Sequence, residues 1–195
     1  GPNPICVGDA SELFFPVLSG TEPFNVDWID DNGGNGTYNV DATGNIVSTG
    51  LPQPISPIIT TTYSLISVAD AKGCTNTLNG TAILVVNELP FVDVSGTTEM
   101  CDGEVTQIYF DFTAGNGPWT VDYNVNGTPQ VFPPTFNIFD SLAISPSTTT
   151  VYTINSVSDA NCSSLITDVV TISVNPLPEA TISGGGSLCD DGSTT

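Results

Sequence analysis

The chain of 195 residues carries 21 acidic side chains and a single lysine, with no arginine and no histidine, for a net charge of −20. A field of this sign repels nucleic acid and anionic lipid surfaces, so no nucleic-acid partner is expected. No apolar stretch approaches the roughly 20 residues of a membrane helix, so direct membrane insertion is not expected either. Because 39% of the residues are hydrophobic, the chain is expected to build a core rather than remain an acidic tail.

A cysteine-led segment opens the chain and returns twice, as "GPNPICVGD" at 1, "GTTEMCDGE" at 96 and "GGGSLCDDG" at 184. In each copy a glycine stands five residues before the cysteine; the pairs are Gly1 and Cys6, Gly96 and Cys101, and Gly184 and Cys189. The recurrence predicts three units, namely 1–89 with its first strand truncated, 90–177, and 178–195 as the start of a third. Both ends then fall inside repeats, so the chain is expected to be part of a longer array.

The segments after each opening cysteine alternate between apolar and polar residues. Phe24, Val26 and Trp28 show this in the first repeat, and residues 119–125 show it in the second. A period of two between Gly, Pro, Asn and Asp breaks predicts short antiparallel strands and no helix. Repeats of about 90 residues built in this way are typical of an immunoglobulin-like antiparallel β-sandwich. A proline soon after the last strand of each repeat predicts stiff joins, and hence a rod of all-β domains.

An acidic cluster lies where the two repeats differ in length. Segment 29–54 is longer in repeat 1 and rich in Gly, Asn and Asp, which predicts a surface loop. Asp27, Asp30, Asp31 and Asn32 offer the oxygen ligands that calcium prefers, although their spacing departs from an EF-hand. A calcium site therefore competes with a hydrated hairpin loop and with a paired-carboxylate glycosidase, which repeat 2 does not support. We expect no catalytic residues and no cofactor other than this hypothetical calcium ion.

A second pair of near-copies is "YSLISVADAKGC" at 63–74 and "YTINSVSDANC" at 152–162. Asp70 and Asp159 occupy one position in the two copies, and each is expected to accept backbone N–H bonds in a turn. Aromatic residues at repeat-equivalent positions are expected in the core rather than on a sugar-stacking surface. These residues are Trp28, Trp119, Tyr63 and Tyr152.

Five cysteines are distributed over the repeats. Pairing within each repeat, Cys6 with Cys74 and Cys101 with Cys162, gives the same bond in both copies and leaves Cys189 for a partner beyond the chain. Each bond would contribute about 4 kcal/mol and would imply export to an oxidising compartment. Buried free cysteines are the alternative, and zinc is less favoured because histidine and a close Cys-x-x-Cys pair are missing.

Several motifs carry a resemblance to a known family, namely "CVGD" at 6–9, "CDGE" at 101–104, "GPWTVDYNVNGTPQ" at 117–130 and "NPLP" at 175–178. Together they resemble the tandem immunoglobulin-like and PKD-like repeats of very large Bacteroidota surface proteins, the gliding-motility adhesins of SprB type. The resemblance implies a filamentous adhesin that is exported by type IX secretion, displayed at the outer membrane and moved by the gliding machinery. It also implies O-glycosylation at Asp-Ser/Thr-apolar sites, for which Ser141 is the candidate, with an unmodified loop as the alternative.

The sequence thus favours a non-catalytic repeat segment of a large secreted cell-surface adhesin that acts in surface attachment and gliding motility. Its expected partners are further repeats of the same chain, a polysaccharide or other surface ligand and, by the resemblance, the type IX secretion and gliding machinery. The alternative is a pair of accessory carbohydrate-binding or spacer modules of a secreted hydrolase. That alternative predicts an exposed aromatic strip on one sheet, whereas the adhesin segment predicts buried aromatics.

Overall fold

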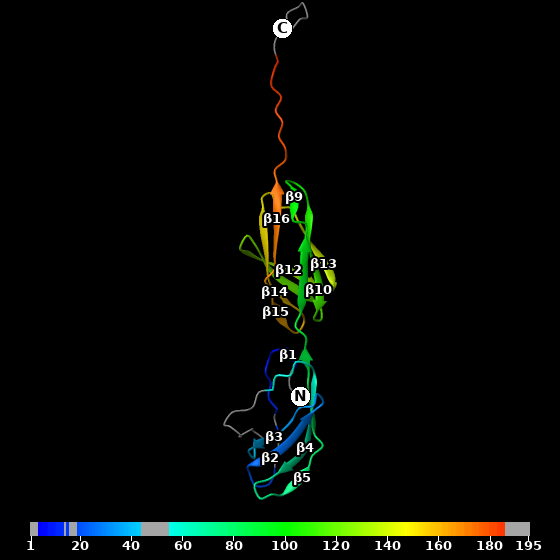
Figure 1. Cartoon of the computed structure of the whole chain (residues 1–195), viewed down its shortest axis with the longest axis vertical. Coiled ribbons are helices and arrows are strands. Elements are labelled where there is room, and N and C mark those ends of the chain that lie inside the picture. Colours follow the sequence, from blue (N-terminus) through cyan, green and yellow to red (C-terminus); the bar gives the residue numbers. More distant parts are fainter. Residues whose placement is uncertain (1–3, 14, 16–18, 44–54, 186–195) are drawn as a thin grey trace, which may run out of the picture.

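A computed structural model describes residues 4–13, 15, 19–43 and 55–185 of the chain. All regular structure in these ranges is β-strand, and no helix occurs in them, which confirms the all-β prediction. The described part of the chain accordingly contains no helix that could cross a membrane. Figure 1 shows the strands in two groups that follow one another along the long axis of the molecule.

The first group, here called unit 1, spans residues 4–87. Its strands are β1 (Ile5–Cys6), β2 (Phe24–Asp30), β3 (Asn35–Val40), β4 (Thr61–Ala69), β5 (Thr75–Thr77), β6 (Thr81–Leu84) and β7 (Val86–Asn87). The central sheet has the order β3-β2-β4-β5, and β6 also pairs with β4. These pairs are antiparallel, whereas the short β1 runs parallel to β7.

The second group, unit 2, spans residues 91–175. Its strands are β8 (Phe91–Gly96), β9 (Glu99–Cys101), β10 (Thr106–Ala114), β11 (Trp119–Val125), β12 (Thr128–Thr135), β13 (Phe139–Ile144), β14 (Thr150–Ser158), β15 (Ser163–Leu165) and β16 (Val169–Asn175). They form one sheet of order β13-β10-β8 and another of order β12-β11-β14-β16-β9, with β15 on β14. The two sheets give a sandwich-like arrangement that is consistent with an immunoglobulin-like fold.

Side chains from both sheets of unit 2 meet in one core. Phe110 and Ile108 come from β10, and Val121, Ile154 and Ile172 come from the opposite sheet. Each such side chain contributes about 1.5–3 kcal/mol by leaving water, so these contacts hold the sheets together. The core described in unit 1 contains Phe15, Phe24, Val26, Tyr38 and Val40.

The repeat-equivalent aromatics largely behave as predicted. Trp119, Tyr63 and Tyr152 are buried, which confirms that they belong to the core. Trp28 is half-buried and packs against the unit 1 core, stacked on Tyr38 with ring centroids 5.6 Å apart. Its indole Nε1 is buried without a hydrogen-bond acceptor. The core role therefore holds for all four side chains, with Trp28 at the edge.

Candidate functional site: the disulfide-linked junction

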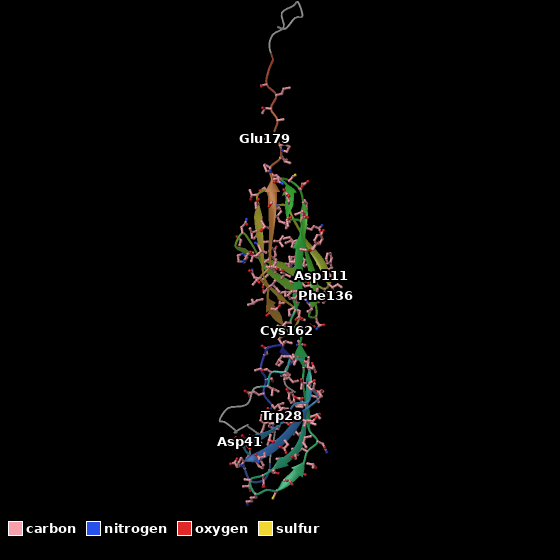
Figure 2. All side chains as sticks on the ribbon, in the orientation of Figure 1. Trp28, Asp41, Asp111, Phe136, Cys162 and Glu179 are labelled. Carbon is pink, nitrogen blue, oxygen red and sulfur yellow. A yellow bond between two sulfur atoms is a disulfide. The ribbon has the colours of Figure 1, made fainter. Side chains whose placement is uncertain are left out.

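A disulfide joins the two units. It connects Cys6, in β1 of unit 1, to Cys162, just before β15 of unit 2, with a Cα–Cα distance of 5.9 Å and a sequence separation of 156. Figure 2 labels Cys162 where the two units meet. The within-repeat pairing predicted from the sequence is therefore wrong, because Cys74 and Cys101 are free and exposed. Cys189 lies outside the described residues.

Strand geometry explains why the within-repeat bonds do not form. In unit 2, Cys101 lies opposite Asn175, at the end of the sheet where β14 begins. Cys162 lies beyond the other end of β14, after its last residue, Ser158. The nine residues of β14 span about 25 Å, far beyond the roughly 7 Å over which a disulfide joins two Cα atoms. In unit 1, β4 separates Cys6 from Cys74 in the same way.

A short parallel pairing fixes the position of Cys6. Cys6 lies opposite Asn87 in the β1–β7 pair, and the next N–H along, that of Val7, donates to the Asn87 carbonyl at 3.0 Å. The Cys6 N–H donates to Asp9 Oδ2 at 3.1 Å. Gly8, at φ 97°, supplies the left-handed backbone that this turn requires and that side chains disfavour. The Cys-x-Gly-Asp motif is therefore a turn that places a sulfur at the end of unit 1.

A carboxylate-centred turn fixes Cys162. Asp159 Oδ1 accepts the N–H groups of Asn161 at 2.8 Å and Cys162 at 2.7 Å, and its Oδ2 accepts that of Asn116 at 2.7 Å. Partial burial opposes ionisation of this carboxyl, but the three backbone donors together lower the pKa of Asp159 below its usual 3.8. The prediction that Asp70 and Asp159 accept backbone N–H bonds is thus confirmed for Asp159. For Asp70, the donors are Thr21, Lys72 and Cys74.

The chain packs closely around the junction. The Ser164 hydroxyl donates to the carbonyl of Pro90 in the connecting segment, and Cys6 Sγ lies 3.6 Å from the Asn161 carbonyl oxygen. A side chain on Gly115 would lie 2.9 Å from Pro90 Cα and 2.7 Å from Asp159 Oδ2, at a φ of 89°. Only glycine fits there without displacing the backbone. The covalent bond is therefore supported by contacts of the connecting segment with unit 2.

The predicted calcium ligands do not converge. The Asp27 carboxylate accepts the hydroxyls of Ser67 and Thr37, each at 2.6 Å, and these bonds lower the pKa of Asp27. Asp30 instead accepts backbone N–H groups of its own hairpin, from Asn32 at 2.9 Å and Gly34 at 2.7 Å.

The rest of the acidic cluster is engaged in the same local way. Asp31 accepts the Thr62 N–H at 3.0 Å, and the Asn32 side-chain amide donates to Thr61 Oγ1 at 3.0 Å. No group of three metal-ligating side chains occurs among the described residues. These bonds give the cluster a role in shaping the hairpin, and calcium binding stays a prediction.

The predicted glycosylation residue lies on a sheet edge. Ser141 is in β13, half-buried, and its N–H lies 2.8 Å from Asp140 Oδ1. Asp140 also accepts the Thr135 hydroxyl at 2.6 Å, and this bond is the largest cause of its lowered pKa. Because β13 is the outer strand of its sheet, a modification at Ser141 stays a prediction that the topology allows.

Comparisons with known proteins add no relative at this point. No family model matches the chain, and no curated protein matches it. The class that the fold and the site define is therefore an all-β chain of two units, the second of them sandwich-like, that are joined by a disulfide.

Proposed function

We propose that this chain is a non-catalytic segment of a secreted, filamentous cell-surface adhesin that acts in surface attachment and gliding motility, of the SprB type in Bacteroidota. In this role the units are spacers that carry tension between the cell and the substratum. The protein would be extracellular, exported by type IX secretion and held at the outer membrane. Its partners would be further repeats, the gliding machinery and a polysaccharide or other surface ligand.

The Cys6–Cys162 bond is the observation that carries the proposal. A disulfide between successive units, rather than within one, restricts rotation and bending at the join. Such bonds persist in oxidising, extracytoplasmic compartments, which agrees with export. The single lysine and the absence of arginine also leave trypsin-like proteases one site, which suits a surface-exposed filament.

The test is the location of the protein on living cells. An antibody raised against residues 91–175 should label intact cells of the organism that encodes the chain, and deletion of its type IX translocon should remove the label. Deletion of the coding region should abolish spreading on agar. Label that appears only after permeabilisation, or a strain that spreads normally without the protein, would overturn the proposal.

A carbohydrate-binding module is the second candidate, and one surface feature favours it. The rings of Tyr109 and Phe139 stack on the β10–β13 pair with centroids 5.6 Å apart, and Phe139 is 57% exposed. Phe136, which is 78% exposed, lies between β12 and β13, and Asp111 of β10 pairs with Phe139 of β13. Exposed aromatic faces beside polar groups suit pyranose rings.

A direct binding experiment separates this candidate from a spacer. If unit 2 binds glycans through these rings, the double substitution Phe136→Ala with Phe139→Ala should abolish binding on a glycan array. Val169→Ala, an exposed apolar residue on β16 of the other sheet, is the matched control and should bind normally. Equal binding by both variants would remove the module from consideration.

A further inference from the structure

Among the described residues, two free cysteines stand at the outer ends of the strand-containing part. Cys101 ends β9, at the end of unit 2 away from the junction, and Cys74 directly precedes β5, at the opposite end of unit 1. Figure 1 shows β9 and β5 at opposite ends of the strand-containing part. Both residues are exposed. Each is therefore accessible to a partner approaching along the long axis.

Cys101 stands in the same local frame as Cys6. It lies opposite Asn175 in a parallel strand pair, its N–H donates to Glu104 Oε2 at 2.8 Å, and Gly103 adopts φ 86°. These features match, one by one, the parallel pairing, the carboxylate bond and the left-handed glycine that place Cys6 at the junction. The outer end of unit 2 therefore presents Cys101 as unit 1 presents Cys6.

Cys74 stands in the frame of Cys162. Asp70 Oδ1 accepts the Cys74 N–H at 2.9 Å, and Asp70 Oδ2 accepts the Thr21 N–H at 3.2 Å. The Asp70 N–H in turn donates to the Cys74 carbonyl at 3.0 Å, as the Asp159 N–H donates to that of Cys162 at 2.9 Å. The outer end of unit 1 therefore presents the Cys74 sulfur in the same kind of carboxylate-centred turn that holds Cys162 at the junction.

The segment beside Cys101 is exposed, whereas the equivalent segment beside the bonded pair is covered. Leu89 is half-buried and Pro90 buried in the segment that connects the units, whereas the equivalent Leu177 is 58% exposed and Pro178 is exposed too. Ile182 is 100% exposed, although the residue 88 positions before it, Val94, packs against the unit 2 core. The described residues at this end thus carry the elements of a junction and are exposed.

We propose that the junction between units 1 and 2 is reproduced at both outer ends, so that Cys101 forms a disulfide with the Cys74-type cysteine of the unit docked after unit 2, and Cys74 forms one with the Cys101-type cysteine of the unit docked before unit 1. A second copy of the chain, docked head to tail, supplies that unit in the test. This inference rests on the proposed function, in which repeats continue end to end. Formation of the bond removes one proton and one electron from each thiol. A glutathione disulfide accepts both electrons and both protons, its S–S bond breaks, and two glutathione thiols are released.

Charge complementarity favours head-to-tail docking of a second copy in that test. Lys72, the sole Lys or Arg of the chain, lies in the Cys74 turn. At the existing junction the corresponding turn, at Asn161, shares one hollow with Asp9. Because Glu104 takes the place of Asp9 in the second repeat, head-to-tail docking brings Lys72 towards the acidic turn at Asp102 and Glu104. The attraction between a cation and an acidic turn favours head-to-tail docking over the two alternatives, in which Cys101 meets Cys101 or Cys74 meets Cys74.

The experiment uses the full chain with Cys189→Ser in every variant, so that Cys74 and Cys101 are the only cysteines outside the Cys6–Cys162 bond. Cys74→Ser leaves Cys101 free, and Cys101→Ser leaves Cys74 free. The two variants are mixed in equal amounts in a glutathione redox buffer, and the covalent dimers are mapped by mass spectrometry after cleavage at acidic residues. Because docking raises the local concentration of the two sulfurs, we expect the Cys101–Cys74 heterodimer to exceed all homodimers about tenfold.

Each outcome decides the inference. Random collision gives as much homodimer as heterodimer, and this result, or the absence of any dimer, would overturn it. Adding Lys72→Glu to the variant with free Cys74 should lower the heterodimer yield severalfold, while Lys72→Arg should preserve it. Mapping of the Cys6–Cys162 bond in the same digest shows whether each variant is folded. If that bond is intact while pairing is random, the inference fails and the proposed function does not.

Discussion

Units 1 and 2 build the same turn around their second cysteine, yet the two sulfurs have opposite fates. Cys162 is 5% exposed and bonded to Cys6, whereas Cys74 is exposed and free. The carboxylate at the centre of each turn accepts the same kind of backbone donors. The difference is that unit 1 lies against the turn that holds Cys162. The comparison teaches that each repeat forms the turn by itself, while the bond belongs to the join.

The largest effect should come from opening the core of one unit. Phe110→Ala removes a fully buried ring from between the sheets of unit 2 and should lower its free energy of unfolding by about 3–5 kcal/mol. Since the turns belong to their own units, hydrogen exchange should rise in β10–β16 and remain unchanged in β2–β4. Phe24→Ala, in the unit 1 core, is the matched control and should reverse the pattern. Equal loss of protection in both units would show that they fold as one.

Removal of the junction bond should have the next largest effect. The double substitution Cys6→Ser with Cys162→Ser should lower the free energy of unfolding by about 2–4 kcal/mol, because the bond constrains the unfolded chain. Small-angle scattering should also show a wider range of maximum dimensions as the units bend at residues 88–90. The control, Cys74→Ser with Cys101→Ser, should match the monomeric parent in denaturant melts and scattering. A control that loses as much stability as the junction variant would contradict the assignment.

A matched pair of glycines sharpens the comparison further. Gly115 and Gly20 are repeat-equivalent and both have positive φ, but a side chain on Gly115 meets the Pro90 backbone, whereas one on Gly20 meets the Phe24 and Asp70 side chains. Gly115→Ala should therefore cost about 2–3 kcal/mol, and Gly20→Ala about 1 kcal/mol. Chemical denaturation of the two variants tests this order. Equal costs would mean that the connecting segment does not pack on unit 2.

The smallest effect concerns acid. Partial burial raises the pKa of Asp159, but three backbone donors outweigh it, so the folded pKa lies below the usual 3.8. A lowered folded pKa contributes stability that is present above pH 3.8 and is lost as the pH falls through the folded value. Asp159→Asn should reduce the decrease in the stability of unit 2 as the pH falls, which thermal melts from pH 5 to about 2 measure. An unchanged acid profile in the variant would show that the turn is not the source.

The sequence was sufficient for the fold class and for the turns. Alternation at Phe24, Val26 and Trp28 predicted a strand that the structure places in β2, and Asp70 and Asp159 act as predicted because an Asp before a turn has few other roles. Repetition alone did not settle the cysteine pairing. A bond within each repeat and a bond shifted by one repeat recur equally in every copy, so the repeat pattern is compatible with either. Only the length of β4 and β14 separates the two pairings, because each strand places the two cysteines of its unit at opposite ends.

The acidic cluster shows a second limit. Asp27 and Asp30 are near in sequence, but Asp27 faces the hydroxyls of neighbouring strands while Asp30 accepts donors of its own hairpin. Residue type predicts affinity for a cation, whereas convergence depends on side-chain direction along a strand, which alternates from one residue to the next. The calcium and glycosylation predictions therefore await direct binding and mass measurements.

The pairing of Cys6 is the most direct test of the disulfide-linked junction. The chain is oxidised, its free thiols are alkylated, and the unreduced protein is cleaved at acidic residues, since one lysine gives trypsin too little to cut. Mass spectrometry of the monomer fraction should find the peptide that contains Cys6 linked to the peptide that contains Cys162, with Cys74 and Cys101 alkylated. Cys6 linked to Cys74, together with Cys101 linked to Cys162, would contradict the junction and restore separate, internally bonded repeats.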